Sequence, residues 1–316
     1  MKFYRRYIIY NIIGLALFIT GTLPGYGQQD PIYNQYQFNT LVINPAYAGS
    51  RDMLSLMLLS RQQWVGFEGA PKTQTFTAHT PVTLKHIGLG LSFVKDEIGP
   101  VSQTAFFADY SYKFLVTENT SLSLGLKGGF NHFVVDFSKL DQTITSEDPA
   151  YSQSKYNKML PNFGFGAYLT NHHYYFGLSV PRIMQNDLSK STNDEGSVNS
   201  KEVRHYFIMG GGIFNLSQYF KLKPSFMGRF SEASPASVDI NLNTLYNEKL
   251  WFGVMYRLNS AFGGVLQYQF TPQLKIGYAY EMNINDLQKI NDGTHEIMVS
   301  FEFNFKKGQV YNPRYF

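Results

Sequence analysis

The sequence contains no cysteine, only two tryptophans and few charges, since Lys, Arg, Asp and Glu make up 16% of its 316 residues. The absence of cysteine excludes a disulfide framework, a thiol nucleophile and any metal site built on thiolates. The net charge is only +4, and the basic residues form no run or stripe, so nucleic acid is not an expected partner. Beyond the N-terminal region, no stretch approaches the ~20 consecutive apolar residues that a membrane-spanning helix needs.

Tyrosine and phenylalanine are abundant, with 23 and 27 copies, and hydrophobic residues make up 44% of the chain. The mean hydropathy is nevertheless only -0.22, which argues against a helical membrane protein. A membrane β-barrel has such a composition, because its lipid-facing apolar residues alternate with polar residues that face the lumen. Tyr and Phe then suit a surface that meets both lipid and water.

The first 27 residues have the three parts of a cleavable export signal. These are a basic start, an apolar stretch and a small-x-small cleavage site, found at Lys2, Arg5 and Arg6, at residues 7–20 and at Gly25-Tyr26-Gly27. An uncleaved membrane anchor is the alternative, but the apolar stretch is short for a membrane span. We therefore expect residues 1–27 to be a signal peptide and Gln28 to be the mature N-terminus.

From Met53 onward the sequence alternates between apolar and polar residues, as a strand with two different faces requires. In residues 238–243, for example, Val, Ile and Leu alternate with Asp, Asn and Asn. The pattern predicts an all-β fold, a single antiparallel transmembrane barrel of about 14 strands that occupies residues 51–306. The expected strands are residues 52–63, 72–82, 86–96, 102–114, 120–135, 161–170, 173–180, 204–215, 220–230, 236–246, 250–258, 261–270, 273–282 and 294–306.

The connections between these strands alternate in length, as bacterial barrels with short periplasmic turns and longer external loops require. The expected longer or more polar connections are residues 64–71, 97–101, 136–160, 181–203, 231–235 and 283–293, and only the turn at Asn259-Ser260 is short on that side. A secreted soluble propeller or sandwich would also alternate, but its loops would show no such parity. The pattern therefore favours an outer-membrane location, with a periplasmic C-terminal tail at residues 307–316.

Residues 28–50 precede the barrel and read as irregular, because Pro31 and Pro45 interrupt any regular element. The lumen-facing positions are rich in Gly, Ser, Asn and Gln and look poor in charge. Three consecutive glycines at residues 210–212 indicate a bend or close packing against something inside the barrel. We therefore expect residues 28–50 to fold back into the lumen as a plug.

The sequence shows no strong catalytic signature, and we expect neither an enzyme nor a bound cofactor or metal. His295-Glu296 lacks the second histidine of a zinc-protease motif, and neighbours on a strand point to opposite faces. We expect this pair to be polar residues at the membrane rim. No serine lies in a Gly-x-Ser-x-Gly elbow.

Several stretches of the mature chain resemble the PorP/SprF family of type IX secretion outer-membrane proteins. The matching stretches are Gln29-Asp30-Pro31 with Tyr33, Asn44-Pro45-Ala46-Tyr47-Ala48-Gly49, Arg61-Gln62-Gln63-Trp64, Gly293-Thr294-His295-Glu296-Ile297-Met298 and Pro313-Arg314-Tyr315-Phe316. The resemblance implies a non-enzymatic barrel that either contacts periplasmic ring lipoproteins or serves as the partner that exports and anchors one large surface adhesin. The adhesin-partner role is the more numerous in the family, and we favour it.

The parts that a barrel does not itself need are the places where we expect partners to bind. These are the opening segment, the polar loops at 136–160 and 181–203, and the aromatic, basic tail. The candidate partner-binding residues are Asn44, Pro45, Tyr47, Gly49, Tyr311, Arg314, Tyr315 and Phe316. Outer-membrane lipid is the other expected contact, and no small-molecule substrate is expected. The alternatives are a channel for hydrophobic small molecules, like the fatty-acid transporters that also use 14 strands, and a general porin.

Overall fold

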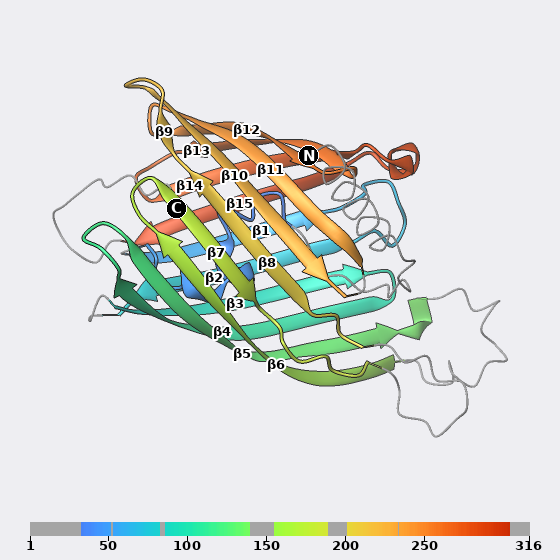
Figure 1. Ribbon diagram of the computed structural model, residues 1–316. Helices are drawn as coiled ribbons and strands as arrows, with labels where there is room; N and C mark the ends of the chain where they lie inside the picture. The colour runs from blue at the N-terminus through green and yellow to red at the C-terminus, as the bar shows by residue number, and fades with distance from the viewer. Residues whose placement is uncertain are drawn as a thin grey trace, which may run out of the picture.

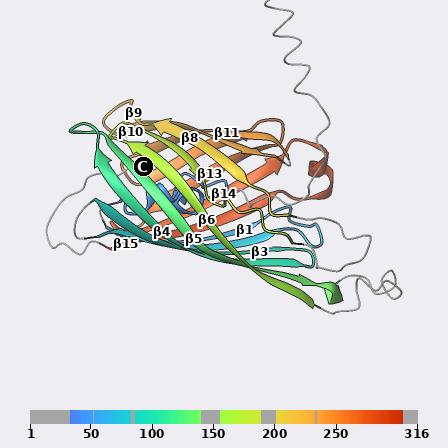
Figure 2. The same cartoon turned by 60° about the horizontal axis from the view of Figure 1, so that its bottom comes forward.

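A computed structural model describes residues 33–51, 53–82, 86–139, 155–188, 201–232 and 234–303. The expected signal peptide at 1–27 and the C-terminal tail at 307–316 lie outside these described residues. The described chain forms one antiparallel β-barrel, which surrounds a short N-terminal stretch (Figures 1 and 2). The strands are β1 Leu54–Gln62, β2 Lys72–Pro81, β3 Ile87–Ile98, β4 Val101–Leu115, β5 Ser121–Asp136, β6 Lys155–Thr170, β7 Tyr174–Val180, β8 His205–Gly212, β9 Phe214–Asn215, β10 Phe220–Ser231, β11 Ser234–Tyr246, β12 Leu250–Arg257, β13 Ala261–Gln269, β14 Leu274–Asn283 and β15 Thr294–Phe303. The described helical turns are α2 Thr40–Ile43, η1 Pro45–Tyr47, η2 Phe137–Lys139 and η4 Asp286–Ile290.

The barrel closes because its first and last strands pair with each other. β1 and β15 are antiparallel, in a register that runs from Leu54 opposite Phe303 to Gln62 opposite His295. β8 and β9 both pair with β10, so they are two parts of one barrel strand, interrupted at Ile213. The barrel therefore has 14 strands, as the alternation predicted.

The interruption at Ile213 follows the three glycines at 210–212 directly. A Cβ at Gly211 would lie 2.8 Å from side-chain atoms of Ser225 and Tyr175, which is closer than atoms can approach. The neighbouring strands therefore approach this backbone as only glycine permits. The glycines thus allow close packing, here against the neighbouring strands β7 and β10 of the wall.

Strand ends differ from the predicted ones at the loop side of β6 and in two hairpins. β6 begins at Lys155 rather than at residue 161, and its first residues, which show no regular alternation of polar and apolar side chains, pair with the end of β5. β3 and β4 are joined by residues 99–100, and β10 and β11 by residues 232–233. The connections predicted at 97–101 and 231–235 as longer or more polar are therefore shorter than their predicted bounds, at two residues each.

The described parts of the remaining longer connections lie together at one end of the barrel, on the right in Figure 1. They are residues 63–71, 137–139, 181–188, 201–204 and 284–293. We call this the loop end, and the opposite end, where β1 begins and β15 stops, the turn end. In bacterial outer-membrane barrels the longer loops face the exterior and the short turns face the periplasm.

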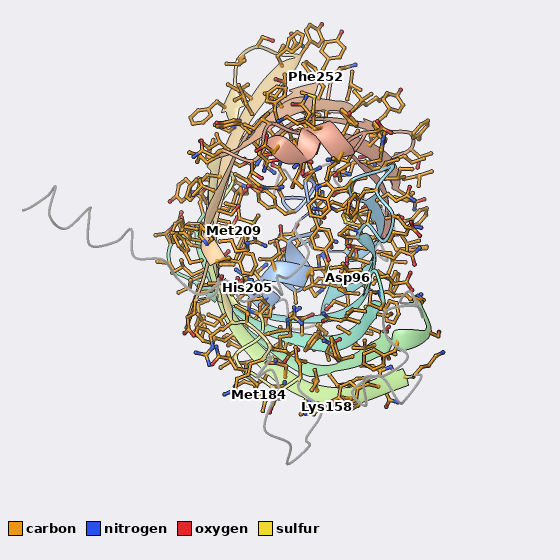
Figure 3. The ribbon with its side chains drawn as sticks, turned by 90° about the vertical axis from the view of Figure 1, so that its right-hand side faces the viewer. Asp96, Lys158, Met184, His205, Met209 and Phe252 are labelled. Carbon is orange, nitrogen blue, oxygen red and sulfur yellow. The ribbon has the colours of Figure 1, made fainter. Side chains whose placement is uncertain are left out.

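The outer surface of the barrel is apolar because alternate side chains of each strand point outward. On β5, Leu124 and Leu126 are 47% and 63% exposed, whereas Ser123 and Lys127 are buried. Phe252 on β12 lies on the same outer surface, while Asp96 and His205 point toward the interior (Figure 3). The exposed side chains form the belt that faces lipid. In the described part of the chain, no helix is long and apolar enough to cross a membrane.

β7 is shorter than its neighbour β6 and ends at Val180. Toward the loop end, residues without regular secondary structure take its place in the wall. Residues 181–188 continue beside β6, and the Ile183 amide donates to the Phe163 carbonyl. The buried carboxylate of Glu202 accepts hydrogen bonds from three side-chain amides, those of Asn131, Asn162 and Asn186. Polar side chains of the lumen thus hold this wall in place where strand pairing stops.

Candidate functional site

Residues 33–50 lie inside the barrel, where strands surround them on all sides (Figure 3). From Tyr33 to Gly49, every residue of this luminal segment is buried except Val42, which is half-buried. Isolated in water, so short a segment would form no stable helix, and α2 has only four residues. Its conformation therefore depends on contacts with the wall.

The start of the luminal segment is bound by one carboxylate. Glu296 of β15 accepts hydrogen bonds from the backbone amides of Asn34, at 3.0 Å, and Gln35, at 2.9 Å. Both bonds are charge-assisted, and such bonds are roughly twice as strong as neutral ones. Burial raises the pKa of the neighbouring Tyr33 hydroxyl, and the carboxylates of Asp96 and Glu296 raise it further, so this phenol stays neutral.

Glu296 is also the last member of a row of alternating charges, which we call the charge ladder. Arg61 lies between Glu296 and Glu281, with N–O distances of 3.3 and 3.4 Å. Arg257 then lies between Glu281 and Asp239, at 3.2 and 2.8 Å. The ladder crosses β15, β1, β14, β12 and β11 and all its side chains are buried. Removing one member of a buried pair costs roughly 3–5 kcal/mol, because its partner is left as an uncompensated charge.

Side-chain amides hold the middle of the segment to strands on opposite sides of the barrel. Gln267 of β13 donates to the Gln35 side chain at 3.0 Å, and Asn241 of β11 donates to the Tyr36 hydroxyl at 2.9 Å. On the far side, Asn39 donates to the Thr75 hydroxyl of β2 at 2.9 Å. These bonds satisfy polar groups that would otherwise be costly to bury.

Phe38 lies nearer the turn end, in a cluster of aromatic rings and lysines. Its ring contacts Trp251 edge to face, with 5.8 Å between centroids. The ammonium groups of Lys223 and Lys275 lie 5.3 and 5.1 Å from the Phe38 centroid, close enough for cation–π attraction. A buried phenylalanine therefore packs against two buried lysines, one from β10 and one from β14.

Helix α2 is held at its C-terminal end by Lys127 of β5. The Lys127 ammonium donates to the carbonyls of Leu41 and Val42, at 3.2 and 3.3 Å, and lies 3.2 Å from the Asp109 carboxylate. A cation is favourable here because the last carbonyls of a helix have no partner within it. Lys127 and Asp109 are both buried, so each requires the other.

The Asn44-Pro45-Ala46-Tyr47 turn binds the wall at β5, β6 and β7. The Asn44 amide donates to the carbonyls of Ala167 and Leu178, and its oxygen accepts from the Ala46 amide, which begins the turn η1. β5 and β6 have glycine where they face this turn, because a larger side chain there would collide with it. A Cβ at Gly166 would lie 2.0 Å from Asn44 Oδ1, and one at Gly125 would lie 2.2 Å from the Ala46 nitrogen.

The segment ends at the turn end of the barrel with an ion pair to the last strand. Arg51 lies 2.6 Å from Glu302 of β15 and also donates to the Tyr47 hydroxyl at 3.2 Å. Gly49, with a φ of +67°, donates its amide to His79 Nδ1 at 3.2 Å. The luminal segment is thus fixed at both ends to β15.

A cavity of about 850 Å³ opens at the loop end, above the charge ladder. We call it the vestibule. Its lining includes Arg61, Arg257 and Glu281 of the ladder, together with Trp64 and the Asn259 turn. This hollow therefore has a charged floor and a mixed polar and aromatic rim. Within the described ranges, no group of three or more His, Cys, Asp or Glu residues could hold a metal ion.

The structure places four of the predicted partner-binding residues inside the barrel. Asn44, Pro45, Tyr47 and Gly49 are buried and contact the wall of their own chain. A contact with another protein stays a prediction for them. The other four, Tyr311, Arg314, Tyr315 and Phe316, lie outside the described residues.

Two expectations about the lumen were wrong. The lumen is not poor in charge, since buried Arg, Lys, Asp and Glu side chains face it from most strands. His295-Glu296 is not a pair at the rim, because Glu296 is fully buried and holds the luminal segment. His295 faces outward and bonds the Tyr278 hydroxyl. The sequence did contain a signal for the ladder, because charged residues occupy inward-facing positions near the loop ends of several strands.

A closed antiparallel barrel with an apolar belt and a polar interior is an outer-membrane β-barrel. Residues 25–301 match the family model of the type IX secretion system membrane protein PorP/SprF. The chain belongs to this family and is an outer-membrane component of type IX secretion, as the resemblance of its motifs predicted. No curated protein matches the sequence.

Solved barrels share the fold. The monoaromatic hydrocarbon channel CymD matches with a TM-score of 0.50 and 13% identity, over 89% of this chain and 96% of its own. The toluene transporter TodX of Pseudomonas putida matches with a TM-score of 0.50 and 10% identity, over 90% and 96%. A FadL homologue of Pseudomonas aeruginosa matches with a TM-score of 0.46 and 12% identity, over 89% and 96%. At these identities the likeness extends to the fold alone.

Proposed function

We propose that this barrel is a docking protein of type IX secretion, which binds a secreted surface protein such as an adhesin and helps to export or anchor it. The observation that carries the proposal is the filled lumen. Residues 33–50 bond to strands around the whole circumference, from β2 through β7 and β11 to β15. A barrel whose lumen is filled in this way does not provide an open pore, so we infer that it acts by binding a partner at its surfaces.

The energetics of the luminal segment support a permanent plug. Opening the lumen would break the two bonds to Glu296, expose the Lys127–Asp109 pair and separate Arg51 from Glu302. Hydrogen bonds to charged groups contribute roughly 1.5–3 kcal/mol each, so their simultaneous loss is comparable with the stability of a whole domain. A general porin needs a lumen that stays open, which these contacts oppose.

A channel for hydrophobic small molecules also fits poorly. The cavity between the luminal segment and strands β3 to β5 holds about 80 Å³. An apolar cavity that binds benzene in another protein has roughly 150 Å³. The lining here includes Asp96, Lys127 and Arg182, whose charges disfavour a hydrocarbon.

The vestibule and the loops around it form the surface that we propose for a secreted partner. It is concave, lies at the exterior end and combines charges with Trp64, and aromatic and arginine side chains are common in protein interfaces. A link to periplasmic ring proteins would instead use the turn end and the tail at 307–316. The two roles therefore place the partner on opposite sides of the membrane.

Two matched asparagines allow the roles to be separated. Asn259 lies in the β12–β13 turn at the loop end, and Asn247 in the β11–β12 turn at the turn end. Both are exposed and both have positive φ, at +54° and +49°. Tryptophan at either position adds the same bulk and meets the same backbone strain, so only the side of the membrane differs.

The experiment is to delete the gene, restore it as wild type, Asn259→Trp or Asn247→Trp, and measure surface display of each type IX substrate. We expect deletion to abolish display of at least one surface protein, Asn259→Trp to reduce it severalfold and Asn247→Trp to restore it. Loss of display with Asn247→Trp alone would instead indicate the periplasmic role. Unchanged display of every substrate after deletion would contradict the proposal altogether.

A further inference from the structure

We infer that the vestibule accepts a lysine or arginine side chain of the partner protein, and that the cationic head group of this side chain pairs with Asp96 of β3. Asp96 lies near the loop end of its strand and points into the barrel (Figure 3). It lines both the vestibule and the smaller cavity between the luminal segment and strands β3 to β5. That the cation comes from a secreted protein rests on the proposed function, whereas the site itself consists of residues of this chain.

Asp96 differs from the other buried carboxylates of the described residues, because it has no ion pair. The others each pair with an arginine or lysine, at distances from 2.8 to 3.7 Å; they are Asp109, Glu202, Asp239, Glu281 and Glu296. Asp96 is 7% exposed, and within the described ranges its carboxylate accepts one hydrogen bond, from the Thr73 hydroxyl at 2.6 Å. Aspartate is rarely buried unless it is paired, so this carboxylate lacks the cation that its burial calls for.

Cations that line the same two cavities are paired with other carboxylates. Arg61 lies between two glutamates of the charge ladder. In the smaller cavity, Arg182 and Lys127 each have an ion pair of their own, at 3.7 and 3.2 Å. None of these three side chains is therefore the partner of Asp96.

The floor of the vestibule carries a net negative charge as a result. The ladder contributes three carboxylates and two arginines. Arg229 also lines the vestibule and balances the third carboxylate of the ladder, so the charge of Asp96 remains uncompensated. A cationic group is thus the occupant whose charge complements this floor.

The size and lining of the vestibule favour a side chain over a metal ion. Its volume of about 850 Å³ can take a segment of peptide together with its side chains. Trp64 contributes an indole ring to the lining, and both lysine and arginine bind to the face of such a ring. Among the described residues, Asp96 belongs to no group of three or more His, Cys, Asp or Glu that could hold a metal.

Binding of short peptides to the purified barrel in detergent tests the site directly. The probes are acetyl-Gly-Arg-Gly-amide and acetyl-Gly-citrulline-Gly-amide, which have nearly the same shape but differ in charge, and saturation-transfer NMR measures their binding. The barrels are the wild type, Asp96→Asn and the matched control Glu97→Gln. Glu97 is the next residue of β3, and its side chain is 41% exposed beside Lys95 on the outer face. Both substitutions therefore remove one negative charge from the same place in the strand, but only the first removes it from the vestibule.

We expect the wild type and Glu97→Gln to bind the arginine peptide saturably and roughly tenfold or more tightly than the citrulline peptide, and Asp96→Asn to lose this preference. Urea unfolding of the same samples separates binding from folding. Asp96→Asn should unfold at the same or a higher urea concentration than the wild type, because it removes an unpaired buried charge and keeps an oxygen for the Thr73 hydroxyl. Equal binding of the two peptides to the wild type would overturn the inference, as would an unchanged preference in an Asp96→Asn barrel that unfolds more easily.

The source of the cation is tested in the deletion strain. Asp96→Asn should reduce display of the same surface protein that Asn259→Trp affects, while Glu97→Gln should restore it. Normal display with Asp96→Asn would overturn the assignment of the cation to the secreted protein. The peptide measurement does not depend on secretion, so failure of the proposed function would not alter it.

Discussion

The carboxylate of Glu296 accepts a hydrogen bond of 2.9 Å from the backbone amide of Gln35, which lies 261 positions earlier in the chain. The same carboxylate accepts from Asn34 and pairs with Arg61. One side chain of the last strand therefore connects the start of the luminal segment to the charge ladder.

Glu296→Gln removes the negative charge while keeping the size of the side chain. We expect a loss of about 2–3 kcal/mol in the free energy of unfolding, because the bonds to Asn34 and Gln35 lose their charge assistance and Arg61 keeps only Glu281. The measurement is urea unfolding of the purified barrel in detergent. The control is Glu118→Gln, at an exposed position in a turn, which should leave stability unchanged.

Gly125→Ala tests the fit between β5 and the Asn44–Tyr47 turn. The new methyl group would lie 2.2 Å from the Ala46 nitrogen, so the turn or the strand must move, at a cost of about 1–3 kcal/mol. Gly128→Ala on the same strand is the matched control, because nothing lies within 4 Å of its Cβ position. We expect limited proteolysis to cut the luminal segment faster in Gly125→Ala only. Equal cleavage of both variants would contradict this packing.

Lys127→Met tests the buried cation at the end of α2. The substitution leaves the Asp109 carboxylate without its partner, which should destabilise the barrel by about 3–5 kcal/mol. Adding Asp109→Asn removes the uncompensated charge, so the double variant should recover part of the loss. The temperature at which the compact gel band disappears measures both effects. A double variant less stable than Lys127→Met alone would show that the two charges act independently.

A double-mutant cycle between Arg257 and Glu296 tests whether the charge ladder acts as one unit. The two side chains are joined only through Glu281 and Arg61. We expect Arg257→Gln and Glu296→Gln to be non-additive, with a coupling energy of about 0.5–3 kcal/mol in urea unfolding. Pairing Glu296→Gln with the exposed Glu118→Gln should give simple additivity. Additive effects in the first pair would mean that the ladder is a set of separate ion pairs.

Ion conduction provides a test that does not depend on stability. In a planar bilayer we expect no porin-like conductance from the wild-type barrel, because the luminal segment fills the lumen. Steady ohmic conductance of the wild type would contradict a permanent plug. Transient openings in Gly125→Ala, absent in Gly128→Ala, would place the turn at Asn44 among the contacts that keep the lumen closed.

Alternation in the sequence predicted the 14 strands because each transmembrane position must face either lipid or lumen. It failed at the start of β6, where residues 155–160 read Lys-Tyr-Asn-Lys-Met-Leu and do not alternate in polarity. It also missed that only residues 99–100 connect β3 and β4, because the polar residues at the end of a hairpin have the same composition as a loop.

The interior could be predicted only in part. The sequence identifies Arg61, Glu281 and Arg257 as inward-facing, but their pairing depends on which strands become neighbours across the closed barrel. In the closed barrel, β15 lies between β14 and β1, and the Arg61 side chain of β1 reaches past β15 to Glu281 of β14. This pair therefore depends on the pairing of the first and last strands and not on any local sequence pattern. The same holds for Asn44, whose carbonyl partners belong to β6 and β7.

The pairing of β1 with β15 also sets an order of assembly. The luminal segment is made first, yet Glu296 and Glu302, which hold its two ends, belong to the strand that is made last. The bonds at both ends of the segment can therefore form only after the last strand has been made. Docking of the segment and pairing of β1 with β15 then stabilise each other, so we expect the cylinder to close around the segment and not before it.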